Sequence, residues 1–266
     1  MNQQTLIDRV SAALADDQRI RGLFLSGSFG RGTADAFSDV DFWAVVAKPD
    51  QEAVAADWRK LLETIAPIVY FNRLPWALVL NAITDEWLRC DLDIGAPDQL
   101  AGRTQDRLKP LIDRDGVYAS LPAVPPARDI DAGRAQAIVN EFIRVLGLLP
   151  VALGRGETEL MVTGTGLLRR SLTDLLILEV NLPDPGGMLH LSRVLDAGRM
   201  AILAAIPLPT LSVESAVEVN LALARVFVPR ARMLYAQLDL AWPEAFETAT
   251  RLHLAQALPA PYRPDW

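Results

Sequence analysis

The sequence predicts an α+β protein, in which an N-terminal α/β domain with a mixed sheet precedes a C-terminal helical bundle. Up to residue 121, short apolar runs alternate with amphipathic stretches, as in a sheet covered by helices. Beyond residue 127, long segments carry helical periodicity, and three prolines separate the halves. We therefore expect domains at residues 1–121 and 128–256, and an extended tail at 257–266.

Apolar spacing predicts the elements of the first half in order. Leu6, Val10 and Leu14 share one helical face, which predicts a helix over residues 6–15, and the same spacing predicts a helix over residues 51–65. Short apolar runs predict strands at residues 20–26, 40–47, 68–71, 76–83, 87–94 and 111–118.

Turn residues connect these elements. Thr84-Asp85-Glu86 predicts a hairpin, and Asp115-Gly116 predicts a turn that breaks the last strand. A glycine-rich loop follows the first strand, and residues 97–108 predict a short helix.

The second half predicts helices only. Their expected ranges are residues 132–149, 159–179, 189–205, 215–238 and 243–255. Pro150, with Gly154 and Gly156, should end the first, and Pro229 should kink or break the fourth. The apolar stretches at 202–211 and 221–234 would bury either an intramolecular core or a homodimer interface.

Composition excludes several classes of protein. Of the 266 residues, 51% are hydrophobic, enough for a core, and the net charge of −7 argues against a nucleic-acid partner. No apolar run approaches the roughly 20 residues of a membrane span. Cys90 is the only cysteine, so an internal disulfide is excluded. With a polar N-terminal segment in place of a signal peptide, we expect a cytoplasmic location.

Residues 23–46 carry the chemistry. An apolar strand delivers Gly27-Ser28 into a loop with Gly30, where backbone N–H groups and the Ser28 hydroxyl can approach phosphate oxygens. Asp39 and Asp41 then lie two residues apart at the start of another strand, so both point to one face. Two adjacent carboxylates repel each other unless a divalent cation lies between them, and oxygen ligands suit Mg²⁺.

This segment resembles the signature of the polymerase-β-type nucleotidyltransferase superfamily, which is Gly-Ser followed by Asp-x-Asp. The resemblance implies an enzyme that moves a nucleoside monophosphate from an NTP to a hydroxyl and releases pyrophosphate. It also implies two metal ions and a third carboxylate on a neighbouring strand, either as a ligand or as the base. Asp91 in Cys90-Asp91-Leu92-Asp93 matches that carboxylate, and Asp93 is the alternative.

Within the superfamily, the chain looks most like the small antibiotic nucleotidyltransferases that modify lincosamides and aminoglycosides. This resemblance implies Mg²⁺, an NTP (ATP by expectation), a small hydroxyl-bearing acceptor and a role in antibiotic resistance. It places Arg31 and Arg170 at positions that meet the phosphates. Two alternatives stay open: modification of a protein partner, as by antitoxin-like members, and a non-catalytic nucleotide-binding module.

Overall fold

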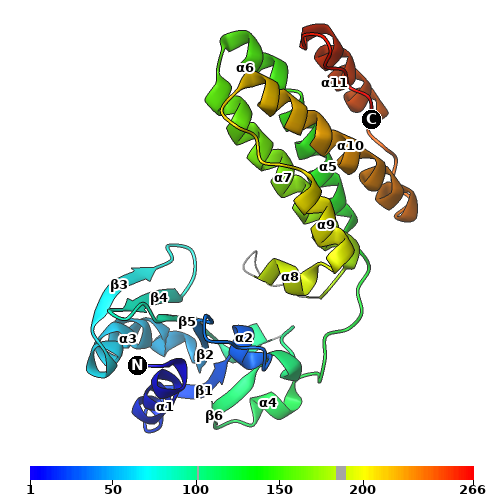
Figure 1. The fold of residues 1–266 in the computed structure, drawn as a ribbon. Helices are drawn as coiled ribbons and strands as arrows, with labels where there is room; N and C mark the ends of the chain where they lie inside the picture. Colours follow the sequence, from blue (N-terminus) through cyan, green and yellow to red (C-terminus); the bar gives the residue numbers. More distant parts are fainter. Residues whose placement is uncertain (101, 184–189) are drawn as a thin grey trace. The chain divides into compact units, whose positions relative to one another are not determined.

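The computed structural model describes residues 1–100, 102–183 and 190–266. Its contacts divide the chain into two compact units, Met1–Pro126 and Ala127–Trp266 (Figure 1). The α+β class is confirmed, because a mixed sheet fills the first unit and helices fill the second.

The first unit is built on a six-stranded sheet. In chain order its strands are β1 (Ile20–Leu25), β2 (Val40–Val46), β3 (Ile68–Arg73), β4 (Val79–Thr84), β5 (Arg89–Gly95) and β6 (Lys109–Asp113). Their order across the sheet is β3-β4-β5-β2-β1-β6. The β2–β5 pair is parallel and the other neighbouring strands are antiparallel, so two strands distant in the chain start side by side.

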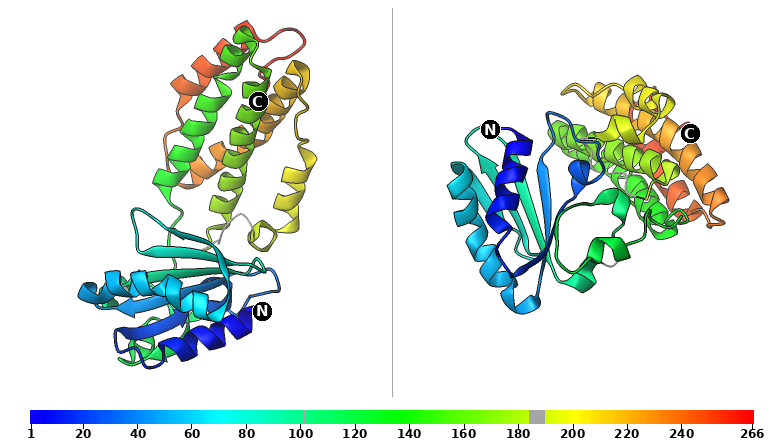
Figure 2. Two further views of the ribbon diagram at one scale, coloured as in Figure 1. Left: turned by 90° about the vertical axis from the view of Figure 1, so that its left-hand side faces the viewer. Right: turned by 90° about the horizontal axis from the view of Figure 1, so that it is seen from below.

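Helices cover one face of this sheet. Helices α1 (Gln3–Leu14) and α3 (Gln51–Ile65) lie together on it (Figure 2). Because side chains alternate along a strand, Phe42 of β2 packs against Trp58 under these helices, whereas Asp41 lies on the opposite face. That opposite face carries a smaller apolar cluster at its β1 side, which includes Trp43.

Short segments of the first unit differ from the expected ones. The glycine-rich loop contains one helical turn, α2 (Gly27–Gly30). The helix expected at 97–108 is instead two 3₁₀ turns, η2 (Pro97–Leu100) and η3 (Gln105–Arg107), because Gly102 between them has a φ of +89° and interrupts helical geometry. The break at Gly116 is followed by a short helix, α4 (Val117–Ser120). A further 3₁₀ turn, η1 (Lys48–Asp50), precedes α3.

The second unit is a helical bundle. Its helices are α5 (Ala132–Leu146), α6 (Leu149–Arg155), α7 (Thr158–Val180), α8 (Leu191–Val194), α9 (Ala197–Ala205), α10 (Val213–Gln237) and α11 (Glu244–Ala257). Helices α5, α7 and α10 pack along one another, with Phe142 stacked on Phe227 at 3.7 Å between ring centroids (Figure 1).

Two helix boundaries in this unit were predicted wrongly. Pro150 lies in the first turn of a separate helix, α6, instead of ending the first helix, because proline is tolerated in a first helical turn. The segment expected at 189–205 divides into α8 and α9, since the Asp196 side chain caps α9 and accepts a hydrogen bond from the Arg199 backbone N–H; residue 189 itself lies outside the described residues. Helix α10 continues through Pro229 without a break.

The last residues pack onto the bundle. Tyr262 and Trp266 contact its apolar core, and Asp265 pairs with Arg225 at 2.6 Å. The buried apolar residues of 202–211 and 221–234, such as Leu203 and Phe227, lie in this intramolecular core. A homodimer interface stays a prediction.

One stretch, Ala132–Gly154, has the length and apolar character of a membrane span, with a mean hydropathy of 1.6. Half of it is buried inside the protein, as in a core helix, and these properties are weak support for a span.

Candidate active site

Parallel pairing of β2 and β5 brings three carboxylates together. Asp41 lies directly opposite Asp91 in this pair, and Asp39 immediately precedes β2. Carboxylate oxygens of the three residues all lie within 4.8 Å of one another, and each residue is half-buried. No second group of this kind occurs across residues 1–100, 102–183 and 190–266.

The cluster is electrostatically strained without a cation. Burial, followed by the charges of Asp39 and Asp91, raises the pKa of Asp41 to about 6. Burial also raises the pKa of Asp91, against a hydrogen bond from Asn81 that lowers it. Three negative charges in this volume therefore favour either a proton or a metal ion.

A helical turn closes the other side of Asp41. Gly27 has a φ of +55°, and a Cβ atom placed there would lie 1.8 Å from Asp41 Oδ2. Glycine is therefore required both by the backbone conformation and by the approach of the carboxylate. The next residue, Ser28, is only 4% exposed, and its hydroxyl has no hydrogen-bond partner within the described part of the chain.

The other two residues predicted in this loop have separable roles. A Cβ atom at Gly30 would lie 2.2 Å from the Arg107 carbonyl oxygen, so this glycine lets η3 pack against α2. The positive charge of Arg31 lowers the pKa of Asp41 and so opposes the effect of burial. Arg31 therefore lies close enough to act on the carboxylate cluster electrostatically.

Asp93 lies outside the cluster, although it shares a sheet face with Asp91. Its carboxylate is 3.4 Å from an Arg103 guanidinium nitrogen and accepts a hydrogen bond from the Trp43 side chain. In the register of the sheet it lies opposite Trp43, which has no carboxylate to contribute. The structure thus brings Asp91, rather than Asp93, to Asp39 and Asp41.

Arg170 belongs to the second unit. It lies on α7 and pairs with Asp174 at 3.3 Å, with 63% of its side chain exposed. The neighbouring Arg169 donates hydrogen bonds to the carbonyls of Leu203 and Ile206, which is a structural role. A phosphate contact by Arg170 stays a prediction.

Two residues of the site were missed from the sequence. Arg89 pairs with Asp39 at 3.1 Å, and Asn81 donates to Asp91 from the adjacent strand β4. Both could have been found from strand alternation, because Arg89 lies two residues before Asp91 and Asn81 is a polar residue within an apolar strand.

The donor set fits a hard divalent cation. Asp39, Asp41 and Asp91 offer carboxylate oxygens, which Mg²⁺ prefers, and the unpartnered Ser28 hydroxyl beside Gly27 fits a phosphate oxygen. The arrangement can therefore hold a metal ion together with a phosphate group.

Residues 7–92 match the family model of the nucleotidyltransferase domain. This match confirms the resemblance predicted from Gly27-Ser28 and Asp39-Val40-Asp41. The matched residues contain all three clustered aspartates and the helical turn α2.

Solved structures with a similar backbone include an aminoglycoside 6-adenyltransferase from Bacillus subtilis, with 12% identity and a TM-score of 0.42 over 95% of this chain and 98% of that chain. A CCA-adding enzyme in complex with CTP has 13% identity and a TM-score of 0.36, over 97% of this chain and 72% of that chain. A Thermotoga maritima CCA-adding enzyme complexed with tRNA has 12% identity and a TM-score of 0.34, over 96% of this chain and 63% of that chain. No curated protein matches this chain.

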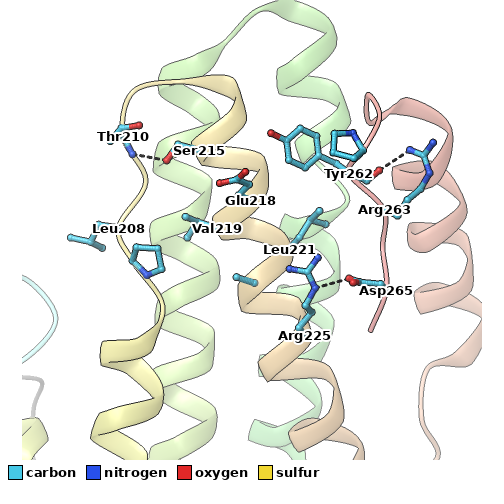
Figure 3. Close-up of a pocket in the computed structure, with 13 residues that line it drawn as sticks. Leu208, Thr210, Ser215, Glu218, Val219, Leu221, Arg225, Tyr262, Arg263 and Asp265 are labelled. Carbon is cyan, nitrogen blue, oxygen red and sulfur yellow. Dashed lines mark hydrogen bonds and ion pairs between the residues drawn. The ribbon is translucent and has the colours of Figure 1, made fainter.

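A cavity of about 750 Å³ lies in the second unit, between α10 and the C-terminal segment (Figure 3). Apolar side chains such as Leu208 and Leu221 line it, and Arg225 pairs with Asp265 at its edge. It contains no cluster of metal-ligating side chains among the described residues, so we place the candidate active site at the three aspartates.

Gly27→Ala should remove metal binding, because the new methyl group would displace the Asp41 carboxylate. Gly32→Ala is the matched control: Gly32 also has a positive φ, +68°, but nothing lies within 4 Å of its Cβ position. We expect both variants to lose about 1–2 kcal/mol of stability from the left-handed backbone. Thermal melting with and without Mg²⁺ should show stabilisation by the ion in Gly32→Ala only, and equal responses would contradict the role of Gly27.

Asp41→Asn should stabilise the metal-free protein at high pH. The folded state raises the Asp41 pKa from 3.8 to about 6, so ionisation of Asp41 opposes folding; stability is greatest below about pH 4 and declines as the pH rises to 6. The variant should therefore gain about 1–3 kcal/mol at pH 8 and almost nothing at pH 4. Urea unfolding in the presence of a chelator measures the free energy of unfolding at both pH values. An equal gain at pH 4 and pH 8 would show that the raised pKa of Asp41 is not its cause.

Proposed function

We propose that this protein transfers a nucleoside monophosphate from an NTP, with ATP as the expected donor, to a hydroxyl group of a small molecule, with release of pyrophosphate. The single observation that carries the proposal is the carboxylate cluster of Asp39, Asp41 and Asp91 beside the Gly27-Ser28 turn. It combines ligands for a divalent cation with a phosphate-binding turn inside a nucleotidyltransferase domain.

Each residue of the site has a role in this reaction. Asp39 and Asp41 would hold Mg²⁺, which when bound neutralises the triphosphate and charge that develops at the α-phosphorus. The Ser28 hydroxyl and the backbone of α2 would hold oxygens of the β- and γ-phosphates. Asp91 would either help to hold a second metal ion or accept the proton of the attacking hydroxyl.

A small molecule fits the charge of the protein better than a nucleic acid does. The net charge is −7, and two arginines on the sheet face that α1 and α3 leave uncovered, Arg89 and Arg103, each pair with a carboxylate. A nucleic-acid backbone needs unpaired cations, whereas an amine-bearing lincosamide or aminoglycoside does not. We therefore place antibiotics of these two classes first among acceptors to be tried.

Pyrophosphate release from each of the four NTPs, with Mg²⁺ and a panel of lincosamides and aminoglycosides, tests the proposal. Release that depends on the acceptor establishes the reaction and its substrate class. If Mg²⁺ and an NTP raise the melting temperature but no small molecule supports release, the acceptor is of another class, and a protein is the first alternative. A chain that binds nucleotide without any transfer would be a binding module.

Asp91→Asn should reduce transfer by more than about 100-fold, because it removes an ionised oxygen at the reacting centre. Asp93→Asn is the matched control, since Asp93 is on the same strand and face but pairs with Arg103. We expect the control to keep turnover within about 10-fold of the wild type. Initial rates at saturating NTP measure both, and the reverse order of effects would move the third carboxylate to Asp93.

A further inference from the structure

A row of polar side chains extends from the carboxylate cluster toward the edge of the sheet. Asp41 of β2 lies opposite Asp91 of β5, Asp91 lies opposite Asn81 of β4, and Asn81 lies opposite Asn72 of β3. Directly opposed residues in a sheet point to the same face, so these four side chains form one line. Asn81 and Asn72, both half-buried, are the two amides of that line.

The two ends of the line differ in chemistry. On the β1–β2 side, the turn α2 presents the unpartnered Ser28 hydroxyl, and Arg31 supplies a positive charge that acts on Asp41. On the β4–β3 side, the described side chains of the line are neutral amides. The nearby Arg89 and Arg103 are engaged by Asp39 and Asp93. Among the described residues of the first unit, a triphosphate therefore finds ligands on the first side of the line and none on the second.

Phosphoryl-type transfer needs the attacking and leaving oxygens roughly in line on opposite sides of the phosphorus. With the leaving pyrophosphate at α2 and the α-phosphorus at the carboxylates, the attacking hydroxyl must approach from the β4–β3 side. We infer that Asn81 and Asn72 form the acceptor subsite, and that the acceptor is polyhydroxylated. This inference rests on the proposed function and adds the place and chemical class of the acceptor.

Amide side chains suit hydroxyl groups because each offers both a donor and an acceptor, as a hydroxyl does. Neighbouring strands lie about 4.8 Å apart, so the line from Asp91 to Asn72 spans roughly 10 Å, enough for a ring that carries several hydroxyls. Tyr70 precedes Asn72 by two residues on β3 and shares its face, with 49% of the residue exposed; its ring offers an apolar surface beside the amides.

The reaction balances with these groups alone. A bond forms between the acceptor oxygen and the α-phosphorus, and the bond from that phosphorus to the oxygen bridging to the β-phosphorus breaks. Pyrophosphate leaves with the electron pair of the broken bond, and the hydroxyl proton passes to Asp91 or to water. Asn81 is a positioning residue as well as a contact, because its hydrogen bond orients Asp91.

The decisive experiment compares Asn72→Ala with the wild-type chain. Initial rates are measured with Mg²⁺-ATP and, as acceptor probes, the aminoglycoside kanamycin and the lincosamide lincomycin. Asn72→Ala should raise the acceptor KM about 3- to 20-fold, the effect of one lost hydrogen bond, and leave kcat and the ATP KM within about twofold. Asn72→Ser, which keeps a hydroxyl, should recover part of the loss, and Asn81→Ala should also lower kcat.

Arg73→Gln is the matched control, because Arg73 follows Asn72 on the same strand but pairs with Glu52 of α3 on the opposite face. Arg73→Gln should leave the acceptor KM, kcat and the ATP KM unchanged. A raised ATP KM in Asn72→Ala would assign the line to the nucleotide and overturn the inference, as would an unchanged acceptor KM. Failure of the proposed function is distinguishable, since the wild-type chain itself would then release no acceptor-dependent pyrophosphate, and the inference would fall with it.

Discussion

Mutual repulsion among three half-buried carboxylates is the constraint on which the rest of the site depends. The parallel pair β2–β5 forces Asp41 and Asp91 to be neighbours, so the surrounding residues must tolerate or relieve their charge. Gly27 makes room for the Asp41 carboxylate, Arg89 pairs with Asp39, and Asn81 donates to Asp91. Such an arrangement costs stability, and it fits the cation and the phosphate of the proposed function better than a purely structural role.

The glycine turn and the first two aspartates of the site could be predicted from the sequence, because the motif that contains them is local. Gly27-Ser28 and Asp39-Val40-Asp41 lie within one strand–turn–strand segment, where strand alternation alone places both aspartates on one face. The choice between Asp91 and Asp93 could not be made in this way. Both have the same alternation, and only the pairing of β5 with β2, a non-local property, puts Asp91 opposite Asp41.

The same distinction explains the errors in the fold. Strands and long helices were predicted because their apolar periodicity extends over many residues, and residues 51–65 form a helix as expected. Pro229 was expected to kink or break α10, and the break does not occur: the helix continues through Pro229 beside buried neighbours such as Val228 and Ala231, whose tertiary packing offsets the local penalty of about 3 kcal/mol. Asn81 was overlooked because a single polar residue in an apolar strand has no signature until its partner is known.

The parallel pairing of β2 and β5 also has a consequence for how the protein folds. The segment that joins these strands contains α3, β3 and β4, so their contact closes a long loop, and we expect it to form later than the local hairpins. During synthesis, Asp39 and Asp41 leave the ribosome well before Asp91. A nascent chain therefore carries only two of the three clustered carboxylates, and the cluster is complete only when β5 enters the middle of the sheet.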